Sequence, residues 1–523
     1  MIRWALFAFL LLVQGTVADA RWREASTHHF LIYSEGDEAE LRQAAEEIER
    51  YDSALRNVTG VGDPDRGPSV RVTIFFVRDV HVLRGLFGGR DSGIWAFYLP
   101  HTRGTIVAPR RGPRPIHASN SIQGRLPDEI QESFTARGVM LHEYTHHFMF
   151  NNFNFGAPLW LSEGYPEFLS TAQFGEDGSI TIGTPPWYRN FEIAQAGDID
   201  ARQILLRPAQ NYRVAGIYGI GWLMSHYLTF DPARYPQLRA YMQALSNGRE
   251  PQEAASAFGD LDQLTSDLRR YRRAREFPVS RIAPERISIG RIAIRELSEA
   301  ENAIMDVRIR SKVGVNRRTA PSVARDARRA AAAYPNDPFV QVSLAEAELD
   351  ARNYAEAEAA ADRALAADPN NVDAHLYKAR AIWGRAEALQ DRNPQTWREV
   401  RTILAAANRL DPDNPEPLKL FYQTYEPSGE APTENAVNGL MAAHEGAPQD
   451  SELRLLATRE RLLRNELDRA RLLFAPIVNG AHGRENREKV AQVMELIHAG
   501  DARGALTRLD ELRAEAKREA EGD

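Results

Sequence analysis

Residues 139–167 read VMLHEYTHHFMFNNFNFGAPLWLSEGYPE and contain a His-Glu-x-x-His motif from His142 to His146. Apolar residues flank the motif on both sides, as a buried helix requires, and we predict a helix over residues 130–151. Four residues advance an α-helix by about 400°, so the two histidines lie within about 40° of each other on one face. Two imidazoles one turn apart can bind the same Zn²⁺.

Glu143 projects from the same helix at a neighbouring angle. From there it can reach a water on the metal and take its proton without being a ligand itself. His147 follows the second histidine directly but points about 100° away from it on the helix. We therefore predict that His147 packs against its surroundings and does not bind the metal.

A third protein ligand is needed if a tetrahedral zinc with two histidines is to keep one position for water. Glu163 is the candidate because it lies 17 residues after His146, far enough for the chain to return as a second helix, predicted over residues 159–171. The chain has no cysteine, so a zinc here must be held by His and Glu. These are the ligand types of an open, catalytic site.

The motif and the WLSEG stretch after it resemble the gluzincins, zinc peptidases whose third ligand is a Glu on the helix after HExxH. The sequence of this stretch is especially similar to that of bacterial peptidase MA-like domains. The resemblance implies that His142, His146 and Glu163 bind Zn²⁺ and that Glu143 is the general base and acid. It also implies that Glu167 hydrogen-bonds a zinc-bound histidine, which we expect to be His142.

The resemblance further implies a downstream Tyr or His that stabilises the oxyanion of the tetrahedral intermediate. Tyr218, which opens a helix predicted over residues 218–228, is the first choice, and Tyr212 is the second. His226, on the same helix, is expected to be structural. A GxMEN-like exopeptidase signature is absent before the HExxH motif, so internal and terminal cleavage both stay open.

The residues before the motif predict a small mixed sheet with helices, from the spacing of their apolar residues. The expected elements are a helix at 38–55 and strands at 21–34, 70–77, 93–99 and 105–108. The stretch 93–99 corresponds to the edge strand that zincins keep, and such an edge can pair with an extended peptide. We expect an α+β zincin-like catalytic domain.

The last third of the chain is repetitive. Pro335 and Pro369 are 34 residues apart, the length of one tetratricopeptide (TPR) repeat. Pro412 follows after 43 residues, an insertion of nine, and Pro448 after another 36. This part resembles TPR proteins, which bind peptides or partner proteins, so we expect an all-α TPR-like helical repeat domain. A generic helical bundle is the alternative.

The composition restricts the partners and the compartment. The 65 basic and 72 acidic residues give a net charge of -7, which argues against a nucleic-acid partner. Residues 1–20 are predicted to be a secretory signal, since Arg3 precedes an apolar run over residues 4–13 and Ala18-Asp19-Ala20 matches a signal-peptidase site. No other long apolar stretch is present, so no stable membrane insertion is expected after cleavage. An exported chain without cysteine fits a bacterial periplasmic or secreted protein.

These observations predict four segments: a signal peptide (1–20), a metallopeptidase domain (21–283), a linker with short strands (284–315) and a TPR-like domain (316–515). The leading hypothesis is an exported zinc metallopeptidase whose zinc-activated water attacks a peptide bond, with the repeats binding a protein or peptide. The alternative is a catalytically inactive zincin-like scaffold in which the repeats act as a protein–protein interaction module. A zinc hydrolase acting on another amide, such as a cell-wall crosslink, is the third possibility.

Overall fold

The computed structural model of the chain describes residues 21–64, 67–86, 95–110, 136–153, 155–186, 189–195, 199–207, 216–480 and 484–522. The predicted signal over residues 1–20 and the second oxyanion candidate, Tyr212, lie outside these residues. Within the described part of the chain, no helix combines the length and the apolar character needed to cross a membrane.

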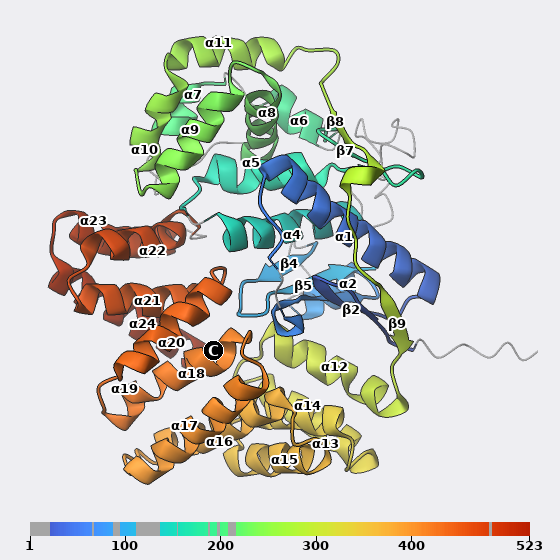
Figure 1. Ribbon diagram of the computed structural model, residues 1–523, viewed down its shortest axis with the longest axis vertical. Helices are drawn as coiled ribbons and strands as arrows, with labels where there is room; N and C mark the ends of the chain where they lie inside the picture. The colour runs from blue at the N-terminus through green and yellow to red at the C-terminus, as the bar shows by residue number, and fades with distance from the viewer. Residues whose placement is uncertain are drawn as a thin grey trace, which may run out of the picture.

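A six-stranded mixed sheet forms the centre of the N-terminal half (Figure 1). Its strands, in spatial order, are β4 (Phe97–Leu99), β5 (Thr105–Pro109), β3 (Val72–Val77), β2 (Phe30–Ser34), β1 (Arg23–Ser26) and β9 (Ala293–Glu296). The pairs β3–β5 and β2–β3 are parallel, and the other three pairs are antiparallel. The predicted small mixed sheet is confirmed, and β4 lies at its edge.

One face of this sheet packs against two helices of the N-terminal half, α1 (Glu38–Thr59) and α4 (Ala136–Asn152). Ile32, Ile74 and Ile106 are fully buried on this face, in adjacent strands and in register with one another. Alternate residues of a strand point to opposite faces, so these isoleucines form one layer of the core beneath both helices.

The opposite face is covered by a helix that lies about 200 residues further along the chain than the strands it packs on. Phe75 and Val107 on this face share one buried cluster with Met305 and Ile309 of α12 (Glu299–Val313). Figure 1 shows α12 on one side of the sheet and α1 and α4 on the other. The sheet is therefore completed by a segment from the second half of the chain.

The rest of the N-terminal half is mostly helical, with a small sheet in the order β6–β7–β8. Its helices are α2 (Val80–Leu86), α5 (Leu159–Ser170), α6 (Asn190–Gln195), α7 (Ala201–Leu206), α8 (Ile217–Phe230), α9 (Tyr235–Ser246), α10 (Pro251–Ala254) and α11 (Leu261–Tyr271). The strands of the small sheet are β6 (Gln173–Phe174), β7 (Ile180–Ile182) and β8 (Ser280–Ile282). The helices predicted over 159–171 and 218–228 are confirmed as α5 and α8.

The second half consists of successive antiparallel helical pairs, which we call the helical domain (residues 299–522). After α12 come α13 (Ala320–Ala333), α14 (Pro338–Asp350), α15 (Tyr354–Ala367), α16 (Val372–Ala388), α17 (Pro394–Leu410), α18 (Pro415–Gln423), α19 (Tyr425–Ser428), α20 (Glu434–Gly446), α21 (Ser451–Leu463), α22 (Leu467–Gly480), α23 (Arg484–His498) and α24 (Ala502–Gly522). The predicted all-α repeat architecture is confirmed at this level, and Figure 1 shows the pairs as a curved array around the sheet.

The recurring Asp- and Asn-containing turns have a clear structural role: each caps the first helix of a pair. The side chains of Asp337, Asn371, Asn414 and Asp450 accept a hydrogen bond from a backbone N–H in the first turn of α14, α16, α18 and α21, respectively. Most of the insertion predicted from the spacing of the prolines is taken up by longer helices, since α16 and α17 have 17 residues each against 13 and 14 in the preceding pair.

The predicted linker over residues 284–315 differs from the observed structure. It contains β9, which pairs with β1, and α12, which contacts both the sheet and α13 and α14. Within the alternating stretch 286–297, only Ala293–Glu296 is a strand. The helical domain therefore begins at Glu299 rather than at residue 316, and this segment joins the two halves through shared core packing.

Candidate metal centre

The HExxH helix, α4, is fixed by hydrogen bonds from Tyr144 and Thr145, which lie between its histidines. The hydroxyl of Tyr144 donates to the carboxylate of Asp52, and the hydroxyls of Thr145 and Tyr51 lie 2.6 Å apart. Asp52 and Tyr51 are adjacent residues of α1. Because both bonds come from one side of α4, the opposite side, with the two histidines, is turned away from α1.

His142, His146 and Glu163 converge as predicted. The Nε2 atoms of the two histidines are 3.1 Å apart, and Oε2 of Glu163 lies 3.5 Å from the first and 3.6 Å from the second. Ligand atoms at about 2.0–2.1 Å from a tetrahedral zinc are about 3.4 Å from one another. The three side chains thus present a triangle of donor atoms of a size that fits Zn²⁺, and two imidazoles and a carboxylate are donor types that zinc accepts.

Glu163 reaches this position because α5 packs very closely on α8. A Cβ at Gly164 would lie 2.3 Å from the backbone of Gly221, so both positions need glycine for the two helices to touch. The same contact brings Tyr218, near the start of α8, to the site, with its ring centre 6.4 Å from that of His142. The glycine of the WLSEG stretch is thereby explained by helix packing.

Glu167 lies on the same face of α5 as Glu163 and is buried. Its Oε1 is 3.7 Å from Nδ1 of His142, the histidine predicted to be its partner. Its shorter contact, 2.7 Å, is with the guanidinium of Arg189. Glu167 thus lies near His142, as predicted, and its carboxylate also pairs with Arg189, a residue that the sequence did not suggest.

Arg189 is the main site residue that sequence reasoning missed. Its guanidinium also binds Glu192 at 2.6 Å and lies 4.7 Å from the ring centre of Tyr218. Glu192 in turn accepts a hydrogen bond from the backbone N–H of Gly219 in the first turn of α8. Arg189 therefore links Glu167 to the helix end that carries Tyr218. It lies between predicted elements, where no periodic pattern marks it.

Glu143 is oriented by the edge strand. Burial raises the pKa of Glu143 to about 7, against the opposing effects of the charge on His142 and of a hydrogen bond from the backbone N–H of Tyr98. A carboxyl group with a pKa near neutrality is well matched to general acid–base chemistry. Tyr98 belongs to β4, so the predicted base and the predicted edge strand are in contact.

His147 does not point toward the other two histidines, in agreement with the prediction. It is buried, and its Nδ1 lies 2.8 Å from the hydroxyl of Tyr98. His226 is also structural, since its two ring nitrogens contact the hydroxyl of Tyr271 and the carbonyl of Gly183. Burial lowers the pKa of His226 to about 4.

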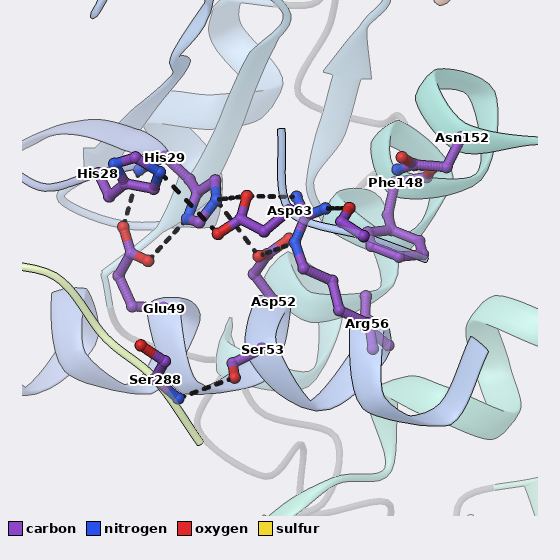
Figure 2. Close-up of polar contacts among 12 residues, drawn as sticks. His28, His29, Glu49, Asp52, Ser53, Arg56, Asp63, Phe148, Asn152 and Ser288 are labelled. Atoms are coloured by element: carbon purple, nitrogen blue, oxygen red, sulfur yellow. Dashed lines mark hydrogen bonds and ion pairs between the residues drawn. The ribbon is translucent and has the colours of Figure 1, made fainter. Parts of the chain in front are cut away.

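A second group with metal-ligand chemistry lies beside α1, close to its contact with α4 (Figure 2). His28, His29 and Asp63 bring donor atoms within 4.8 Å of one another. His29 is also bonded to Glu49, with Nδ1 2.8 Å from the carboxylate, and Arg56 lies 3.8 Å from Asp63. The guanidinium of Arg56 already lies beside these carboxylates, so this cluster is best described as an ion-pair network.

The electrostatics of His29 support that description. Burial alone would lower its pKa, but the hydrogen bonds to Glu49 and Asp63 and the charges of Asp52 and Glu49 raise it to about 9. The protonated ring therefore adds to the ion pairs with Glu49 and Asp63. The network connects the loop after β1 to α1, which in turn holds the HExxH helix.

This network predicts a pH-dependent stability. The folded pKa of His29 is raised from 6.5 to about 9, so its contribution is complete below pH 6.5 and is lost as the pH rises through about 9. The loss is on the order of 3 kcal/mol. Urea unfolding at pH 6 and pH 9.5 should show this decrease in wild type and His28→Gln, but much less in His29→Gln. An equal decrease in all three proteins would contradict the assignment.

Comparison with known proteins does not identify a family for this chain. No protein-family model matches the chain, and no curated protein matches it. Among solved structures, the chain is similar to a thermophilic TPR protein of Thermus thermophilus, at 18% sequence identity and a TM-score of 0.32. The similarity covers 37% of this chain and 97% of that one.

Proposed function

We propose that this protein is a zinc-dependent peptidase, a hydrolase of the gluzincin type. The observation that supports this best is the triangle of donor atoms from His142, His146 and Glu163, with distances of 3.1, 3.5 and 3.6 Å, next to a carboxyl group that is not part of it. A structural zinc site would have four protein ligands, whereas three ligands leave a position open for water or substrate. Glu143 has no evident use in a site without catalysis.

The proposed reaction is hydrolysis of a peptide bond. The chemistry that Zn²⁺ supplies when bound is Lewis-acid activation of water and of the peptide carbonyl. Glu143 takes the proton of the attacking water and passes it to the leaving amine, and its pKa of about 7 suits both steps. Glu167 and Arg189 hold His142 and the start of α8 in place around the reacting groups.

Tyr218 is the proposed donor to the oxyanion. Its side chain is 36% exposed and lies beside His142, and burial together with the charge of Glu163 raises its pKa to about 12, so it keeps its proton at neutral pH. Removing one such donor typically costs about 10²-fold in kcat. Tyr218→Phe should therefore lower kcat by about this factor, with KM and zinc content nearly unchanged. Wild-type kcat in Tyr218→Phe would contradict this role.

The substrate class proposed is an extended peptide or protein segment. The β4 strand is paired on one side, with β5, and forms the edge of the sheet in the described residues. It also contacts Glu143 through Tyr98, so a peptide added at this edge would pass the base. We further propose that the protein is exported, to the periplasm or outside the cell, on the strength of residues 1–20.

Protein binding by the helical domain is the second proposed role. Arrays of antiparallel helical pairs present extended surfaces that commonly bind proteins, and the described part of this chain contains such an array. If the N-terminal half is an inactive scaffold, protein binding is the main function, and the metal centre has no catalytic role.

The experiment that tests the proposed function compares cleavage sites in envelope extracts incubated with wild type or Glu143→Gln. New peptide termini that appear with wild type alone would support the peptidase and define its specificity. Identical termini in both samples would contradict peptidase action and favour the scaffold.

A further inference from the structure

The turn between β4 and β5, residues 100–104, is enclosed by the helical domain. The guanidinium of Arg103 donates two hydrogen bonds to the carboxylate of Asp373 on α16, at 2.7 and 3.2 Å. The hydroxyl of Thr102 donates to Glu416 on α18, at 2.9 Å. The side-chain amide of Gln449, just before α21, donates to the carbonyls of His101 and Thr102. Three successive helical pairs therefore contact one short turn.

These contacts form a buried, charge-paired interface. Thr102 and Gln449 are each 6% exposed. Glu416 is also paired with Lys419, at 2.8 Å. Burial opposes ionisation of Asp373, but Arg103 and Lys312 more than offset it and lower its pKa. Arg103 and Asp373 are partly buried, so removing one of them leaves the other charge partly buried without its partner, which costs more than the loss of a fully exposed ion pair.

The other side of the same turn lies against the HExxH helix. Gly104 has a φ of +62°, and a Cβ at this position would lie 2.9 Å from Nδ1 of His147, so the backbone is in direct contact with the ring. The hydroxyl of Tyr98 lies 2.8 Å from the same nitrogen, and the backbone N–H of Tyr98 faces Glu143 where β4 packs against α4. A continuous set of contacts thus joins Asp373 in the helical domain to Glu143.

We propose that the inner surface of the helical domain, formed by Asp373, Glu416 and Gln449, is an intramolecular binding site for the turn 100–104. Through this contact Arg103 and Asp373 act as positioning residues that hold β4 beside Glu143. The catalytic part of this inference rests on the proposed peptidase function. A protein partner of the inner surface would have to displace the turn, and would thereby change the position of β4.

Two other polar contacts between the two halves do not have this connection. Ser69 donates to Asp411 at 2.9 Å, and His498 lies 3.4 Å from Glu250, but neither pair adjoins β4 or α4. They join the same two halves at other points. His498→Ala is therefore a suitable control for a general weakening of the interface.

The test uses the full chain with Arg103→Met, Arg103→Lys, Thr102→Val and the control His498→Ala. Hydrogen exchange of residues 95–105, zinc content, and kcat and KM on a peptide substrate are measured for each. A misplacement of about 1 Å can cost about 10²-fold in rate, so Arg103→Met should lower kcat by about 10- to 10²-fold with zinc content unchanged. Exchange of residues 95–105 should become faster in Arg103→Met and Thr102→Val, less so in Arg103→Lys, which keeps the charge but not the paired donors, while His498→Ala stays close to wild type.

The outcomes separate this proposal from the peptidase proposal. Unchanged exchange of residues 95–105 in both Arg103→Met and Thr102→Val would overturn the intramolecular site. Faster exchange with unaltered kcat would overturn the positioning role. If wild type and Glu143→Gln hydrolyse peptides equally, the peptidase proposal fails, and the exchange measurement alone then decides whether the turn is bound as described.

Discussion

Glu143→Gln is expected to abolish most peptide hydrolysis while leaving zinc in place. The side chain keeps its size and lies beside, not within, the triangle of His142, His146 and Glu163, so the metal affinity should be nearly unchanged. An amide cannot accept the proton of the attacking water. Loss of a positioned acid–base group typically costs about 10²- to 10⁴-fold, and we expect kcat to fall within this range.

The measurement is initial-rate hydrolysis of a casein-type substrate, with zinc content determined on the same preparations. Glu40→Gln on the exposed side of α1 is a matched control, because it makes the same chemical change far from the site. Full activity in Glu143→Gln with zinc retained would show that another group performs the proton transfer, and the proposed mechanism would then be wrong.

Removal of everything after residue 283 is expected to prevent folding of the N-terminal half. The truncated chain lacks β9 and α12, and so loses Met305 and Ile309 from the cluster that buries Phe75 and Val107. Each large apolar side chain that becomes exposed or is removed costs about 1.5–3 kcal/mol. Several together approach the whole stability of a typical domain, about 5–15 kcal/mol.

A chain that ends at residue 367 is the control, since it keeps β9 and the first two helical pairs. We expect it to unfold cooperatively in thermal denaturation, whereas the chain ending at residue 283 should be insoluble or unfold without a transition. A cooperative transition for the shorter chain within a few degrees of the control would show that α12 is dispensable for the sheet.

The sequence was most informative where the structure depends on local spacing. His142 and His146 are brought together by one turn of helix, and Glu163 by a short connection to the next helix, so their convergence follows from the order of residues alone. The same holds for the helical pairs, whose caps recur at regular intervals.

The features that sequence reasoning missed depend on contacts between distant parts of the chain. The β9 strand pairs with β1 about 270 residues away, and a short alternating stretch gives no indication of which sheet it will join. Arg189 acquires its role only when α5 and α8 meet. Likewise, Arg103 and Asp373 are ordinary charged residues in the sequence, and only the folded chain places them opposite each other.

The most direct test of the central claim, a catalytic zinc site made by this chain, is the metal content of purified protein. Wild type should bind one zinc per chain, and Glu163→Ala should bind substantially less after the same dialysis, because two histidines alone hold zinc weakly. Glu167→Gln is the matched control and should retain most of the metal, since Glu167 contacts His142 from outside the triangle. Wild type that binds no zinc, or Glu163→Ala that binds as much as wild type, would contradict the account.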